Sequence, residues 1–227
     1  MMTDSFYVED SGGGGKDFIP VPPGLHLGRC YRIVDLGTQR TEYMGEEKLQ
    51  RKVMIGWELH GEAADGSPLK TEKGDPMAIF KNYTFSWADK ANLRLDLQSW
   101  RGEPWSDDEA KKFDLTTILD RWCMLNVVHR EGKMGKMFAN VGGISPVPRV
   151  IKQHGMPKGV NKVQLFRIAD PDMALFENFG KGLKTKIESS PEWRARRVSK
   201  APQAPQAYQA PTQASSGFDD MDDDVPF

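Results

Sequence analysis

The stretch MAIFKNYTFSWADKANLRLDLQSWR, residues 77–101, decides the fold, because its apolar spacing changes halfway along. From about Met77 to Ser86 it holds three aromatic residues, which are typical of a strand. Beyond that point Leu93, Leu97 and Trp100 recur at i, i+4 and i+7, which is one face of an amphipathic helix. Ser86 and Asp89 are alternative N-caps for this helix, and Arg101-Gly102 ends it. The stretch therefore predicts a strand followed directly by a helix.

Strands are predicted on both sides of this stretch. Two precede it, at about Leu25–Leu36 and Lys48–His60, joined by a polar hairpin region around Gly45. A short helix near Asp107–Phe113 and a further turn through Leu119 follow it. The chain then continues into strands at about Trp122–Arg130 and Met137–Ile144.

Three strands, a helix and two strands predict a mostly β domain. This is the element order of an OB-fold, a five-stranded barrel with a helix between strands three and four. Other small barrels and α+β folds share the order. In the first strand, strict alternation places Cys30, Val34 and Leu36 with Arg32 on one face. Tyr31 and Ile33 lie with Arg29 and Asp35 on the other, and a one-residue error would invert these faces.

Composition divides the chain into five regions. We predict a flexible leader at 1–17, the barrel as a single-stranded-DNA-binding domain at 18–150, a C-terminal helical extension packed on the barrel at 151–198, a disordered linker at 199–217 and an acidic tip at 218–227. Extended arms that wrap DNA or a partner subunit are the alternative for the extension.

The tip combines a block of negative charge with an apolar end. Asp runs precede Val-Pro-Phe, and the Gln/Ala/Pro/Ser tract before them cannot pack a core. Such a segment suits docking into a basic pocket with an apolar floor on another protein. An ordinary solvating tail is the alternative. The expected partner-binding residues are Asp222, Asp223, Asp224, Val225, Pro226 and Phe227.

The tip resembles that of bacterial and phage single-stranded-DNA-binding proteins, which end in an acidic run and Pro-Phe after a low-complexity linker. The motifs Ser86–Arg94, Trp100-Arg101-Gly102, Phe113-Asp114-Leu115 and Ala139–Pro148, with Lys186–Trp193, look like a group of phage-encoded OB-fold proteins of this type. The resemblance implies sequence-independent binding of single-stranded DNA in phage replication or recombination. It also implies that the tip recruits replication or recombination proteins, in the host cytoplasm. Oligomeric state is open, because such proteins act as monomers, dimers or tetramers.

Charge and composition narrow the function classes. The net charge of −1 divides into −4 from Ser199 onward and +3 before it, so a mildly basic body carries an acidic tail. No apolar run approaches the ~20 residues that span a bilayer, and the N-terminus lacks a secretion signal. The two cysteines and four histidines have no metal-ligand spacing, so we expect no metal, no cofactor and no enzymatic activity.

Single-stranded DNA needs flat rings for its bases and cations for its phosphates. The strands interleave both kinds of residue, and the expected DNA-binding residues are Arg29, Tyr31, Arg32, Lys48, Arg51, Lys52, Trp57, Lys81, Tyr83, Phe85, Arg130, Lys133, Lys136 and Phe138. Trp57 and Phe85 alternate with aliphatic residues, which favours a place in the core, and Lys133 and Lys136 suit a solvated loop. A protein-interaction adaptor or replication accessory factor without direct DNA binding is the first rival function, and an enzyme, such as a nuclease accessory subunit, is the second.

Overall fold

The computed structural model of the protein describes residues 20–43, 45–132 and 136–200. Its strands are β1 (Gly24–Tyr43), β2 (Glu46–His60), β3 (Ala78–Thr84), β4 (Trp122–Glu131), β5 (Met137–Ser145) and β6 (Gln164–Phe166). Its α-helices are α1 (Asn92–Arg101), α2 (Asp107–Lys112), α3 (Arg149–Gln153), α4 (Met173–Glu177), α5 (Lys181–Glu188) and α6 (Pro191–Lys200), with a 3-10 turn η1 (Leu115–Ile118). The predicted leader and acidic tip lie outside the described residues. So does the predicted linker, except for its first two positions, which belong to α6.

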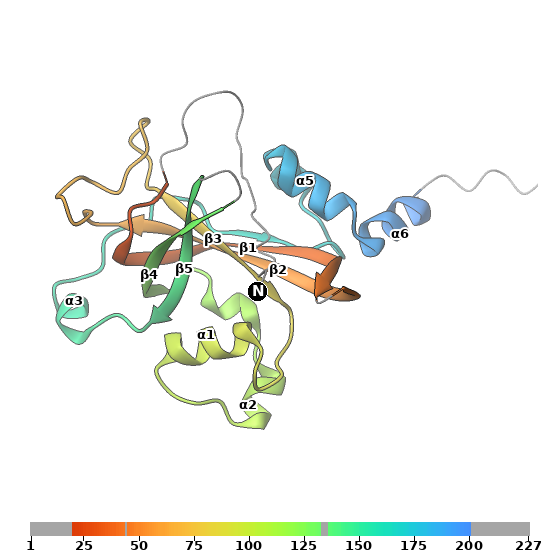
Figure 1. Cartoon of the computed structure of the whole chain (residues 1–227), viewed down its shortest axis with the longest axis horizontal. Helices are drawn as coiled ribbons and strands as arrows, with labels where there is room; N and C mark the ends of the chain where they lie inside the picture. The colour runs from red at the N-terminus through yellow and green to blue at the C-terminus, as the bar shows by residue number, and fades with distance from the viewer. Residues whose placement is uncertain (1–19, 44, 133–135, 201–227) are drawn as a thin grey trace, which may run out of the picture.

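The mostly β architecture is confirmed. The strands form one sheet in the order β3-β2-β1-β4-β5, with antiparallel neighbours, and β6 pairs in parallel with β1. Among the described residues the hydrogen-bonded order stays open between β3 and β5. Figure 1 shows β1 and β2 as the long hairpin that runs through the centre of the molecule.

β1 differs from its prediction in length and in phase. It continues to Tyr43, because the residues after Gly37 pair with the first half of β2. Its register shifts between Cys30 and Arg32 and again between Asp35 and Gly37. Each bulge inserts one residue and reverses the faces beyond it, so the strict alternation predicted for this strand is wrong.

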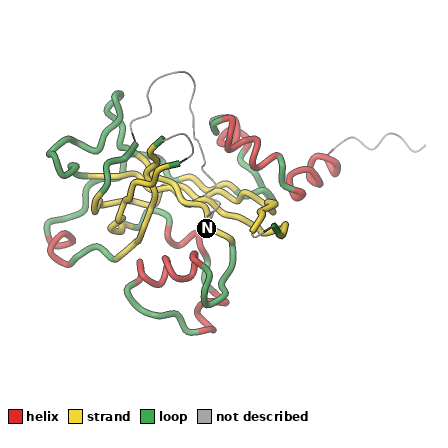
Figure 2. The backbone as a smooth tube through the Cα atoms, in the orientation of Figure 1, coloured by secondary structure: helices red, strands yellow, loops and turns green. Residues whose placement is uncertain are grey.

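Two hydrophobic cores lie on opposite faces of β1 and β2. Ile33 belongs to the first core and its neighbour Val34 to the second. The first core contains the apolar face of α1 (Leu93, Leu97 and Trp100), as the periodicity predicts. The second contains residues of β6 and the C-terminal helices, where Phe176 stacks on Trp193 with ring centroids 4.6 Å apart. Figure 2 accordingly shows α1 and α2 on one side of the sheet and α5 and α6 on the other.

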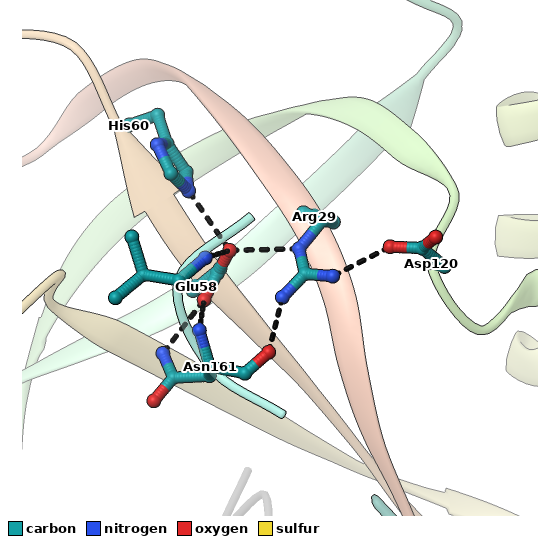
Figure 3. Close-up of polar contacts among 6 residues, drawn as sticks. Arg29, Glu58, His60, Asp120 and Asn161 are labelled. Carbon is teal, nitrogen blue, oxygen red and sulfur yellow. Dashed lines mark hydrogen bonds and ion pairs between the residues drawn. The ribbon is translucent and has the colours of Figure 1, made fainter. Parts of the chain in front are cut away.

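A buried polar cluster fastens the segment after α3 to the sheet (Figure 3). Glu58 on β2 is fully buried and accepts hydrogen bonds from Arg29 Nε at 2.7 Å and from His60 Nε2 at 2.9 Å. It also accepts from the backbone N–H groups of Val160 (3.0 Å) and Asn161 (2.7 Å) and from the Asn161 side chain. Burial alone would raise the pKa of Glu58, but the hydrogen bonds from Arg29, His60 and these backbone groups lower it to about 2.

Arg29 completes this cluster by joining three parts of the chain. Besides Glu58, its guanidinium pairs with Asp120 at 2.5 Å and donates to the carbonyl oxygen of Asn161. Gly159 passes so close that a Cβ there would lie 2.1 Å from Arg29 Cζ. The charge of Glu58 is therefore fully compensated, which is the condition under which a buried ion pair is tolerated.

Candidate nucleic-acid interface

Three of the aromatic residues predicted to stack on bases are buried. Tyr31 is 4% exposed, Tyr83 is 2% and Trp57 is 0%. Trp57 and Tyr83 belong to the first core, and the Tyr83 hydroxyl donates to Asp96 of α1 at 2.7 Å. Tyr31 packs edge-on against Phe80. The burial of these rings counts against base stacking in this structure, and for Trp57 it matches the core position that its alternation with aliphatic residues favours.

Four predicted phosphate-binding cations are engaged in internal contacts. Arg29 is buried in the cluster around Glu58, and Lys81 pairs with Asp96 at 2.6 Å. Arg32 donates to the Gln164 side chain and lies over the rings of neighbouring aromatic residues. Lys52 is half-buried, donates to the Thr84 hydroxyl at 2.7 Å, and has its pKa lowered by burial. These contacts hold the sheet and its helices together, so the four residues are structural here.

One exposed cation–aromatic pair is formed by Arg51, in the first half of β2, and Phe85, which directly follows β3. Arg51 Cζ is 6.0 Å from the centre of the Phe85 ring, and Phe85 is 42% exposed. Arg51 also pairs with Asp35 at 2.7 Å, and this hydrogen bond raises its pKa. Lys48, further along the same hairpin, is exposed and pairs with Glu46 at 3.2 Å. This arrangement places one exposed ring beside one cation, Arg51.

A second cation–aromatic pair, with a half-buried ring, lies on the β4–β5 hairpin. Lys136 Nζ is 5.6 Å from the centre of the Phe138 ring, and exposed Arg130 is the cross-strand partner of Phe138. Gly132 permits this ring position, since a Cβ there would lie 2.4 Å from Phe138. The predicted Lys133 lies outside the described residues.

The two cation–aromatic pairs lie toward opposite ends of the sheet. Arg51 is the partner of Thr38 in β1, whereas Val127, near the end of β4, is the partner of Gly24. These two positions are fourteen residues apart along β1, close to its two ends. The structure therefore divides the predicted interface into two solvent-accessible clusters and a buried middle.

A cavity that the sequence did not predict opens between α1, the α2–η1 segment and the start of β4. Its volume is about 670 Å³, and its walls include Trp105, Phe113, Trp122 and Met156. Arg101 lies 4.6 Å from the Trp105 ring centre and closes one side. Its three tryptophans, Trp100, Trp105 and Trp122, come from α1, the loop before α2 and the start of β4, so no single local pattern in the sequence predicts the cavity.

A basic segment beside this cavity was also missed. Between Ser145 and Ala169 the chain has five cationic and no acidic residues. Arg149, Lys152, Lys158 and Lys162 are all exposed, and Lys152 reaches the cavity wall. These four cations are separated by uncharged residues over 149–162, so they do not form a continuous charge run that the sequence analysis could recognise.

Within the described ranges, no group of three or more His, Cys, Asp or Glu side chains is arranged to hold a metal ion. In the same part of the chain no helix has the length and apolar character needed to cross a bilayer. No protein-family model matches the sequence, and no curated protein is significantly similar to it.

Proposed function

We propose that this protein binds single-stranded DNA without sequence preference, as a phage-type relative of the single-stranded-DNA-binding proteins. The strand order supports a barrel of the OB type, because β3 and β5, the two ends of the open order, are in contact. Closing β3 against β5 would complete five strands, with α1 between the third and the fourth.

The observation that carries the proposal is a pair of solvent-accessible rings, exposed Phe85 and half-buried Phe138, each with a cation beside it. Phe85 with Arg51, and Phe138 with Lys136 and Arg130, combine a π face with positive charge at both ends of the sheet. Stacking on such a ring contributes ~1–3 kcal/mol per base and tolerates any base, while the cations neutralise phosphates. The binding path would run between these two clusters.

The acidic tip would recruit replication or recombination enzymes. Its Asp run and Val-Pro-Phe suit a basic pocket with an apolar floor. The proposed setting is the host-cell cytoplasm during phage DNA replication or recombination, and the protein itself would catalyse no reaction.

Fluorescence anisotropy with labelled oligo-dT and a duplex of equal length tests the DNA-binding proposal. We expect tight binding to oligo-dT that weakens with salt, and much weaker binding to the duplex. The double variant Phe85→Ala, Phe138→Ala should lose at least tenfold in affinity, whereas Leu95→Ala, which removes an exposed apolar side chain from α1, should change little. Equal affinity for duplex, or an unaffected double variant, would contradict the proposed path.

An adaptor that binds proteins is the second candidate. The burial of Tyr31, Trp57 and Tyr83 favours it, because the middle of the expected DNA path lacks exposed rings. A folded protein with no affinity for oligo-dT at low salt would support the adaptor and exclude DNA coating.

A further inference from the structure

The cavity between α1 and β4 is lined with aromatic rings. Three tryptophans and one phenylalanine contribute to its walls: Trp100, Trp105, Trp122 and Phe113. The guanidinium of Arg101, which also lines the cavity, lies 4.6 Å from the centre of the Trp105 ring. Unpaired nucleobases stack on aromatic side chains and on Arg guanidinium planes, and aromatic stacking contributes ~1–3 kcal/mol per base. The walls therefore suit a ligand with a flat aromatic part.

The mouth of the cavity carries positive charge without an internal partner. Arg121 and Lys152 line the cavity and are exposed, and neither forms an ion pair with any residue that the structure describes. The two carboxylates of the lining are each paired with an arginine, Glu109 with Arg101 at 2.8 Å and Asp120 with Arg29 at 2.5 Å. Arg121 and Lys152 are therefore available to an anionic group, and phosphate is the anion that such side chains commonly bind.

The backbone before Arg121 has an unusual conformation. Asp120, with a φ of 65°, is the one residue other than glycine with a positive φ in the part of the chain that the structure describes. Its backbone N–H donates to the Cys30 carbonyl oxygen at 2.8 Å, and the Arg121 carbonyl oxygen accepts from the Cys30 N–H at 2.9 Å. These hydrogen bonds fix the turn between η1 and β4, and so hold Arg121 at the cavity. Residues in this conformation are uncommon and gather at ligand sites.

The shape of the cavity suits a single nucleotide. Its walls come from α1, the α2–η1 segment, the start of β4 and the chain around α3, and Figure 1 shows α1 and α2 close together on one side of the sheet. Its volume of about 670 Å³ lies within the range of pockets that enclose drug-sized ligands. One apolar side chain of a bound peptide would fill only part of this volume, whereas a base with its sugar is of the right size. The middle of a strand fits less well, because its backbone must leave the site in both directions.

We infer that this cavity binds a nucleoside phosphate, with the base and sugar against the aromatic walls and the phosphate at Arg121 and Lys152. Two sources supply this chemistry, a free nucleotide and the 5′-phosphorylated end of a DNA strand. Only the second source rests on the proposed function.

The strand end has a structural route to the cavity. Trp87, two residues beyond Phe85, packs edge-on against Trp105 and Phe113 of the wall, with ring centroids 5.9 and 5.3 Å apart. The exposed Phe85 ring and the wall are therefore connected through one short segment. A strand that crosses Phe85 would have its end held in the cavity.

Proton–nitrogen NMR of the six tryptophan indole N–H groups in the full chain tests the inference. The Trp105, Trp122 and Trp193 signals are assigned by their disappearance in Trp→Phe variants. We expect millimolar dTMP to move the Trp105 and Trp122 signals in a saturable way. The signal of Trp193, which is buried in the second core, should not move.

The base and the phosphate should both be needed. Thymidine lacks the phosphate and inorganic phosphate lacks the base, so each should bind at least tenfold more weakly than dTMP. The variant Arg121→Glu, Lys152→Glu should also weaken dTMP binding at least tenfold. The matched control Lys70→Glu, Lys73→Glu makes the same charge change at exposed positions of the β2–β3 loop and should bind dTMP as the wild type does.

Competition distinguishes the two sources. If a short oligo-dT with a 5′-phosphate displaces dTMP and the same oligonucleotide with a 5′-hydroxyl does not, the site holds strand ends. If neither displaces it, the ligand is a free nucleotide. Saturable dTMP binding by a protein without affinity for oligo-dT would refute the DNA-coating function and retain this site, so the two proposals fail separately.

Four results would overturn the inference. The first is the absence of saturable movement of Trp105 and Trp122 with dTMP. The second is dTMP binding that survives Arg121→Glu, Lys152→Glu while the other indole signals show an intact fold. The third is equal displacement by both oligonucleotides, which would place the middle of a strand in the cavity. The fourth is a synthetic acidic peptide that moves the same signals at lower concentration than dTMP, which would identify a protein ligand.

Discussion

Replacing Glu58 by Gln should destabilise the fold by about 3 kcal/mol at pH 7. Gln keeps the size of the side chain but removes its charge and turns an N–H₂ group toward donors, in a position that is fully buried. A pKa lowered from 4.5 to about 2 corresponds to about 3 kcal/mol of stabilisation. Removing one member of a buried ion pair typically costs about 3–5 kcal/mol, which agrees with this value.

The same change should alter the pH dependence of stability. The folded-state pKa of Glu58 is below its unfolded value, so its contribution is present above about pH 4.5 and is lost as the pH falls toward 2. The difference in free energy of unfolding between wild type and Glu58→Gln should therefore be largest near pH 7 and shrink below pH 4.5.

Urea unfolding followed by tryptophan fluorescence at pH 7, 5 and 3.5 measures both effects. Glu109→Gln is the matched control. The pKa of Glu109 is also lowered to about 2, by hydrogen bonds from Arg101 and Ser106, but its carboxylate is at the surface. The control should change stability far less, because solvent screens exposed pairs. A loss below 1 kcal/mol in Glu58→Gln, or a loss independent of pH, would refute this account of the cluster.

Two further changes test the packing of the C-terminal extension. Trp193→Ala should lower the free energy of unfolding by ~3–5 kcal/mol, because it removes a fully buried ring that stacks on Phe176. Urea titration measures this change, and a loss below about 1 kcal/mol would contradict the packing described for the second core. Gly159→Ala should accelerate limited proteolysis around residues 155–163, since the new Cβ would collide with Arg29, whereas Gly143→Ala has open space and should leave the digestion pattern unchanged.

The sequence predicts the order of the main elements well because their signals are local. Leu93, Leu97 and Trp100 define α1, and Ser106 with Glu109 forms the capping box that starts α2. The short elements α3 and β6 were missed, because five or three residues carry little periodicity. β6 becomes a strand only through its pairing with Arg32–Val34 of β1.

The candidate interface was harder to predict than the fold. Tyr31 and Arg32 have the composition of a DNA-binding strand, but their exposure depends on what covers them. The cover comes from the C-terminal extension, more than 130 residues away, and from bulges that reverse the strand faces. Phe85 and Phe138 remain candidates because they lie near the ends of strands, outside both cores.

The cluster around Glu58 also has a consequence for the order of events during synthesis. Arg29 and Asn161 are 132 residues apart, so a ribosome adding ~5–20 residues per second makes Asn161 about 7–26 s after Arg29. Until then the ion pair between Arg29 of β1 and Glu58 of β2 lacks the hydrogen bonds that the backbone N–H groups of Val160 and Asn161 donate to Glu58. The nascent sheet would spend this interval incomplete, and chaperones that bind unfinished sheets would meet this chain before residue 161 emerges.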